Sequence, residues 1–252
     1  MTDAEKPRLY LITPPLADAE AFLSGLEAAM DAGDVASVLL RFATNDPSTR
    51  KKIVRALAAP AQSRGAALLV EGDAQLAVRA DADGAHLFGL GEPFDEALDT
   101  LKPERIVGAG RLKTRDDAMT AGEDGADYVM FGEPAPDGYA PPVAETIERL
   151  DWWSQIFQVP CVGYAPALSD VAALCAAGAD FVALGEAVRA GARGPAAAAA
   201  EAQAALTARE PALLSPTLKL AVIEFHGREI LVAASRGGLT RLAEAPARGD
   251  AA

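Results

Sequence analysis

The chain has few cysteine, histidine and aromatic residues. It contains two cysteines and two histidines among 252 residues, and aromatic residues make up 6% of the sequence. Two cysteines, Cys161 and Cys175, cannot form a disulfide framework or a metal-binding cluster. Each lies in an apolar segment, which is typical of a small buried side chain. A disulfide-stapled scaffold and a cysteine-ligated metal protein are therefore excluded.

Long apolar runs and positive charge are also scarce. No segment reaches the roughly 18 uninterrupted apolar residues of a membrane span, and the N-terminal residues lack the apolar core of a secretory signal. The 23 basic residues are outnumbered by 36 acidic ones, for a net charge of −13. Such a chain repels nucleic acid and anionic lipid. We expect a cytoplasmic protein whose partner is a small molecule, not nucleic acid or a membrane; homo-oligomerisation stays open.

The sequence does contain a regular alternation of short apolar runs and longer segments of helical period. About eight strand–helix units predict an α/β fold, a (β/α)8 TIM barrel with its working face at the C-terminal ends of the strands. No Gly-x-Gly-x-x-Gly follows the first strand, which weakens the dinucleotide-binding alternative. The expected strands span residues 8–13 (ended by Pro14 and Pro15), 36–42, 66–70, 84–88, 105–108, 126–131, 160–164 and 181–184, and the first helices span residues 17–31, 47–64 and 74–79.

One short motif occurs three times. The segments ADGAHL at residues 82–87, GADYVMFG at 125–132 and GADFVALG at 178–185 share an aspartate directly before an apolar strand. Asp is a common turn residue, and these turns fall at the lower end of the predicted barrel. We interpret the three aspartates as turn-forming residues and not as catalysts.

The pattern changes after the predicted eighth helix. We assign residues 1–208 to the barrel and residues 209–252 to a linker, a β-hairpin and a loose tail. The hairpin is predicted from alternating residues at 218–225 and 229–234 around His226 and Gly227. His226 is interpreted as an exposed turn residue, and residues 249–252 as a loose end.

These segments resemble the thiamine-phosphate synthase and thiazole tautomerase (TenI-like) superfamily of barrels. The resemblance runs from Arg8 to about Ala205, and it rests on LYLIT at residues 9–13 and on the three repeated segments. It implies thiamine biosynthesis: a transferase that joins hydroxymethylpyrimidine pyrophosphate to thiazole phosphate and releases pyrophosphate with the help of Mg²⁺. Such chemistry needs cations for the leaving group and carboxylates for the metal.

The resemblance implies a catalytic cation and a metal site near the second and third strands. Arg41 matches the arginine of the family's Gln-x-Arg-Glu-Lys motif, whose other polar residues are replaced here. It is therefore the candidate catalytic residue and pyrophosphate ligand, unless it is an exposed charge at a strand end. Asp73 and Glu92 are the candidate Mg²⁺ ligands, and Glu71 is a further carboxylate two residues before Asp73. The alternative interpretation of Asp73 is a helix N-cap.

Other positions carry the rest of the implied site. Lys113 is a second candidate catalytic cation, and it follows Arg111 on the loop after the fifth strand. Substrate-binding candidates by resemblance are Arg111, Gly108, Gly132 and Gly163, together with a strand histidine. The alternative for the two loop cations is a solvated loop.

The strand histidine and the expected phosphate site are interpreted separately. His86 is the strand histidine, and a satisfied core role is favoured over a general base because spacing assigns it no partner. At the expected phosphate site, Pro166 has no amide hydrogen to donate, and Glu186 is interpreted as occupying the helix start that a phosphate would use.

Three hypotheses stay open. The first is the family's transferase with an altered site. The second is a tautomerase-like enzyme that acts on a different substrate, and the third is a non-catalytic ligand-binding or regulatory barrel. Fold alone does not decide among them.

Overall fold

The chain divides into two compact units, Met1–Thr207 and Ala208–Ala252. The computed structural model describes residues 7–135, 137–185 and 194–207, and it describes the backbone of four strands between residues 213 and 246. Glu186, His226 and the expected loose end at residues 249–252 lie outside the described residues.

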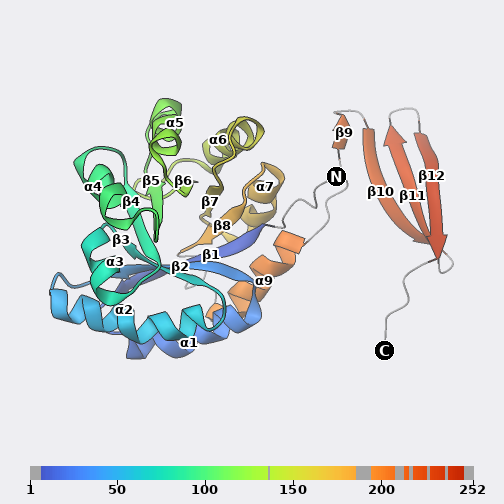
Figure 1. The fold of residues 1–252 in the computed structure, drawn as a ribbon. Coiled ribbons are helices and arrows are strands. Elements are labelled where there is room, and N and C mark those ends of the chain that lie inside the picture. Colours follow the sequence, from blue (N-terminus) through green and yellow to red (C-terminus); the bar gives the residue numbers. More distant parts are fainter. Residues whose placement is uncertain are drawn as a thin grey trace. The chain divides into compact units, whose positions relative to one another are not determined.

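The first unit is a closed barrel of eight parallel strands, which confirms the predicted fold (Figure 1). Neighbours in the sequence pair with one another, and β1 closes the ring by pairing with β8. The strands are β1 (Arg8–Leu16), β2 (Val35–Phe42), β3 (Ala67–Glu71), β4 (Gly84–Phe88), β5 (Ile106–Gly110), β6 (Tyr128–Phe131), β7 (Cys161–Ala165) and β8 (Phe181–Leu184).

Helices surround the strands, and the alternation of side chains along each strand divides the core in two. In β2, Val38 and Leu40 face the helices while Leu39 belongs to the cluster inside the barrel. Both cysteines are free, as expected, and no helix of the described residues has the length and apolar character that crossing a membrane requires. The helices are α1 (Glu20–Ala32), α2 (Pro47–Gln62), α3 (Ala74–Ala80), α4 (Glu92–Leu101), α5 (Arg115–Asp124), α6 (Val143–Ile156), the short η1 (Leu168–Asp170), α7 (Val171–Ala176) and α9 (Pro195–Thr207).

The first strand is longer than predicted. The prediction that Pro14 and Pro15 end the strand is wrong, because β1 continues to Leu16 and Pro15 lies opposite Arg41. The register shifts between Ile12 and Pro15, and at such an irregularity a residue without an N–H group is tolerated. The strand therefore reaches the upper rim.

The three repeated aspartates fasten the lower end of the barrel, which confirms their structural role. Each carboxylate accepts a hydrogen bond from a backbone N–H group near the start of the preceding strand. These bonds satisfy donors that the strand ends would otherwise leave unpaired. The pairs are Asp83 with Leu68 at 2.7 Å, Asp127 with Val107 at 2.7 Å and Asp180 with Cys161 at 2.8 Å.

The second unit is a four-stranded antiparallel sheet in the order β12-β11-β10-β9. The predicted hairpin corresponds to β10 (Leu218–Phe225) and β11 (Arg228–Ser235), which pair in continuous register. Two further strands, β9 (Leu213–Ser215) and β12 (Gly238–Pro246), were not predicted. Backbone hydrogen bonds to β11 form the strand β12, and such bonds do not require a strict alternation of side chains. The sequence pattern therefore did not reveal β12.

Candidate functional site

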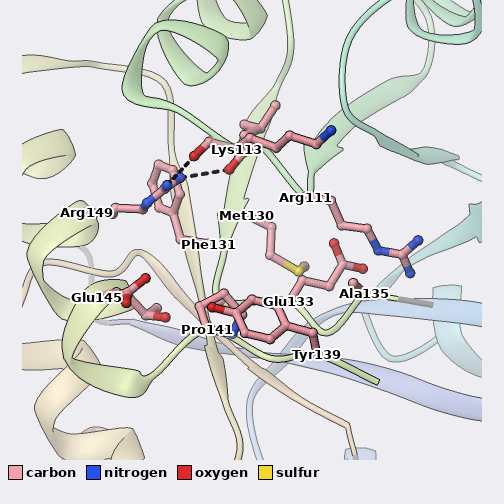
Figure 2. Close-up of a pocket in the computed structure, with 13 residues that line it drawn as sticks. Arg111, Lys113, Met130, Phe131, Glu133, Ala135, Tyr139, Pro141, Glu145 and Arg149 are labelled. Atoms are coloured by element: carbon pink, nitrogen blue, oxygen red, sulfur yellow. Dashed lines mark hydrogen bonds between the residues drawn. The ribbon is translucent and has the colours of Figure 1, made fainter. Parts of the chain in front are cut away.

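A pocket of about 450 Å³ opens at the upper rim, between the end of β6, the loop after β5 and the helix α6 (Figure 2). This is the face on which barrels of this kind carry their sites. Cations, carboxylates and one exposed aromatic ring share its wall. The lining residues that bear on the chemistry are Arg111, Lys113, Glu133, Tyr139, Glu145 and Arg149.

Glu133 connects this pocket to a chain of hydrogen bonds inside the barrel. Its carboxylate oxygen lies 3.2 Å from Nε2 of His86, and Nδ1 of His86 lies 2.8 Å from the hydroxyl of Tyr128. The Tyr128 hydroxyl in turn lies 2.8 Å from that of Tyr10. His86 has no exposed surface, and the Glu133 side chain is only 7% exposed. Both ring nitrogens of the histidine therefore have partners, as the satisfied-core interpretation requires.

Two glycines of β5 make room for this chain of hydrogen bonds. A Cβ on Gly108 would lie 2.0 Å from the Tyr128 ring. A Cβ on Gly110 would lie 2.3 Å from the Glu133 carboxylate and 2.4 Å from Nε2 of His86. Gly108, predicted as a substrate-binding residue, thus faces Tyr128 and is not part of the pocket lining. Its role here is to leave space for a ring.

The two tyrosine hydroxyls stay protonated. Burial raises the pKa of Tyr128 well above its usual range, and it raises the pKa of Tyr10 in the same direction. An uncharged hydroxyl both donates and accepts a hydrogen bond, so each tyrosine can pass the chain of bonds onward.

Arg111 is held in an unusual position at the rim. Its backbone is left-handed, with φ of 52°, and its guanidinium lies 3.5 Å from the centre of the Phe88 ring. Its Nε donates to the carbonyl of Pro134 at 3.2 Å. A strained backbone of this type occurs preferentially at functional sites. The cation is thereby fixed before any ligand arrives.

Lys113 has an exposed side chain, and its backbone is fixed by a neighbouring helix. Arg149 of α6 donates to the carbonyls of Leu112 and Lys113, as the dashed lines in Figure 2 mark. The backbone N–H of Lys113 donates to Asp117 at 3.0 Å. Arg149 therefore positions the loop, and the ammonium group of Lys113 remains available to solvent.

The two remaining glycine candidates pack against helices. Gly132 has φ of 84°, and a Cβ there would lie 2.4 Å from the Thr146 hydroxyl, so the end of β6 approaches α6 closely. Gly132 is also part of the pocket wall. A Cβ on Gly163 would lie 2.8 Å from Leu150, in the helix layer. Gly163 is not among the residues that line the pocket. Its lack of a side chain allows β7 to pack closely against Leu150 of α6.

Arg41 lies on another part of the rim, at the end of β2. Its Nε donates to Glu71 at the end of β3 over 3.1 Å, and the arginine side chain is 39% exposed. Its backbone N–H donates to the Thr13 hydroxyl. Glu71 thus accepts from one of the five N–H groups of the Arg41 guanidinium, and the Glu71 carboxylate offsets the positive charge of Arg41.

The two predicted metal ligands make different contacts in this structure. One oxygen of Asp73 accepts from the backbone of Leu76 at 2.7 Å, and the other lies 3.2 Å from Arg50, so Asp73 is the N-cap of α3. Glu92 is exposed in the first turn of α4. In the part of the chain that the structure describes, three or more potential ligands nowhere come together to hold a metal ion. The N-cap alternative for Asp73 is therefore the one with structural support.

The sequence did not identify Glu133, Tyr128 or Tyr10 as site residues. A partial indication was present, because glycine occupies alternate positions of β5 and so leaves space inside the barrel. The strand register places Gly108 opposite both His86 and Tyr128. Knowing that register would have brought the histidine and the tyrosine together. The contact to Glu133, 47 residues away, required the closed barrel.

Comparison with known proteins decides the family. The model of the family described as thiamine monophosphate synthase matches residues 9–188. The chain belongs to this family. A thiamine-phosphate synthase of Rhodospirillum centenum is 40% identical over 203 residues, which cover 80% of this chain and 97% of the relative. That of Hyphomonas neptunium is 41% identical over 212 residues, covering 79% and 95%.

Solved structures agree on the fold of this family member. A thiamine phosphate pyrophosphorylase from Pyrococcus furiosus matches with a TM-score of 0.67 and 22% identity, over 80% of this chain and 96% of its own. A 3-hexulose-6-phosphate synthase matches with a TM-score of 0.61 and 19% identity, over 78% and 99%. At these identities the likeness concerns the barrel alone.

Proposed function

We propose that this chain is a thiamine-phosphate synthase, which joins hydroxymethylpyrimidine pyrophosphate to thiazole phosphate and releases pyrophosphate. The observation that carries the proposal is the identity of 40% and 41% to two proteins of that name over nearly their whole length. The rim pocket, at about 450 Å³, has the size of a small-molecule site. We place the heterocyclic part of a substrate there.

The cations of the rim support binding of the leaving group. Arg111 is fixed over Phe88, and Lys113 is exposed on the same loop. Arg41 can contribute through the N–H groups that Glu71 does not use. Developing negative charge on pyrophosphate is stabilised when such donors are already in place. The resemblance implies Mg²⁺ for this reaction, but Asp73 is engaged as the N-cap of α3 and in an ion pair with Arg50.

A second function is favoured by one specific observation. On the β2–β3 side, Arg41 pairs with Glu71 and Arg50 pairs with Asp73. The candidate catalytic residue Arg41 and the candidate metal ligand Asp73 are thus each engaged in an ion pair within the protein. This arrangement supports a ligand-binding or regulatory barrel that retains the family's pocket without its turnover.

The test is a coupled measurement of turnover and binding. Purified chain at high concentration is given both substrates, with and without added Mg²⁺, and formation of thiamine phosphate is followed by fluorescence after oxidation. Calorimetric titration with each substrate alone measures binding. Turnover supports the synthase, whereas tight binding without turnover favours the ligand-binding barrel. If the protein shows no turnover and binds neither substrate, both functions are contradicted.

The setting of this function is part of the same proposal. We place the chain in the cytoplasm, with small molecules as partners and neither nucleic acid nor membranes. Homo-oligomerisation stays a prediction, and sedimentation velocity at several concentrations measures it.

A further inference from the structure

Glu133 is a carboxylate at the edge of the pocket whose orientation is set from inside the barrel. Its side chain is 7% exposed and faces His86. Both groups occupy the space that a side chain at position 110 would fill, since a Cβ on Gly110 would overlap them. A buried carboxylate is costly unless it is hydrogen-bonded, and His86 supplies one such bond.

The direction of the hydrogen bonds defines the protonation state. When the Tyr10 hydroxyl donates to Tyr128, Tyr128 donates to Nδ1 of His86 and Nε2–H donates to Glu133, every hydrogen of the four groups has an acceptor. The reverse direction makes Tyr10 seek an acceptor outside these four residues. The first direction leaves His86 neutral and Glu133 ionised.

An ionised Glu133 can accept more than one hydrogen bond. A carboxylate has about four lone-pair positions, and His86 occupies one. Glu133 lines the pocket on one wall, while Arg111 and Lys113 line it from the loop after β5. The pocket therefore presents an acceptor for N–H groups and, separately, cations for an anionic group.

We propose that Glu133, positioned by His86, is a specificity-determining residue that selects a heterocycle carrying an amino group. The ligand class is a planar aminoheterocycle with an anionic substituent: its N–H donates to Glu133, and its anionic group lies toward Arg111 and Lys113. This inference rests on the proposed function, whose pyrimidine substrate is an aminopyrimidine with a pyrophosphate group. A charge-assisted N–H···O⁻ bond is stronger than a neutral one, and loss of the donor leaves the buried carboxylate underpaired.

The wild-type protein tests the proposal without any substitution. Calorimetric titration compares the pyrophosphate ester of the aminopyrimidine alcohol with the same ester in which hydrogen replaces the amino group, in the absence of thiazole phosphate. We expect the amino compound to bind at least about tenfold more tightly. Equal affinities, or no detectable binding of either ester, would overturn the proposal.

Two matched variants locate the preference. Glu133→Gln keeps the shape and an acceptor for His86 but turns an amide NH₂ toward the pocket, so the preference for the amino ester should disappear. Glu148→Gln makes the same change in charge on an exposed residue of α6 that does not line the pocket, and it should keep the preference. The proposal is wrong if Glu133→Gln, with an unchanged unfolding midpoint, retains the preference or if Glu148→Gln loses it.

The outcomes also separate this inference from the proposed function. Amino-selective binding without turnover refutes the synthase and leaves the selectivity of Glu133 in place. Turnover that accepts both esters with equal affinity supports the synthase and refutes the selectivity.

Discussion

The β2–β3 side and the β5–β6 side of the upper rim use similar residues in opposite ways. On the β2–β3 side, Arg41 and Asp73 form ion pairs with Glu71 and Arg50, and the charges are offset within the protein. On the β5–β6 side, Arg111 is fixed by stacking on a ring and stands beside a pocket. The difference teaches that a charged residue at a strand end indicates function only when the fold leaves its charge available to a ligand.

The strongest challenge to this comparison is Gly110→Ala. The new methyl group would overlap the Glu133 carboxylate and His86, both within 2.4 Å of its position. We expect loss of measurable binding of the aminopyrimidine ester and a decrease of about 1–3 kcal/mol in the free energy of unfolding. Calorimetry and urea unfolding measure the two effects. Unchanged binding would show that the β5–β6 side is not the site.

Removing one arginine from each side sharpens the comparison. Arg111→Ala should weaken binding of the pyrophosphate ester by about tenfold or more, since it removes a fixed cation from the pocket. Arg41→Ala should weaken it by no more than about threefold, because Glu71 already offsets this charge. The same titration serves both variants. A larger loss for Arg41→Ala would move the anion site to the β2–β3 side.

Asp73 distinguishes a helix cap from a metal ligand. Asp73→Ala should lower the free energy of unfolding by about 1 kcal/mol, because α3 loses its N-cap. Asp73→Ser keeps a capping oxygen and should restore most of this stability. Neither variant should change ligand affinity or its response to Mg²⁺. If Asp73→Ser is stable but loses an effect of Mg²⁺ on binding, Asp73 is a metal ligand after all.

The smallest expected effect concerns alkaline pH. Burial raises the pKa of Tyr128 above its usual value, so the folded protein holds a proton that the unfolded chain releases near pH 10. The stabilisation from this group is complete below about pH 10 and is lost as the pH rises further. Urea unfolding at rising pH should show a shallower decline for Tyr128→Phe than for the wild type. Equal slopes would contradict the buried hydroxyl.

Much of the fold could be predicted from the sequence because it depends on local patterns. Alternation of apolar strands and helices indicated the barrel, and the repeated aspartates were correctly interpreted as turn residues. The end of β1 was predicted wrongly, since a register shift at Pro15 is a property of the strand pair and not of the proline. The strands β9 and β12 were not predicted for a similar reason, because they form by pairing with a neighbouring strand and not from a local sequence pattern.

Less of the site could be predicted, because its contacts join distant segments. Arg111 and Lys113 were identified from their loop, and both line the pocket. Asp73 was predicted either as a metal ligand or as a helix N-cap, and its hydrogen bond to the backbone of Leu76 is that of an N-cap. His86 was identified, but its partner Glu133 was not.

The sequence by itself determined the barrel, its family and the composition of its upper rim, because periodicity and motif order are carried by neighbouring residues. The tertiary structure decided which of those residues face one another. Barrel closure places Glu133 at His86 and Tyr128, and it pairs Arg41 with Glu71. Whether a charge is offset or available depends on atoms a few ångströms away in space, and for this rim those atoms lie tens of residues away in the chain.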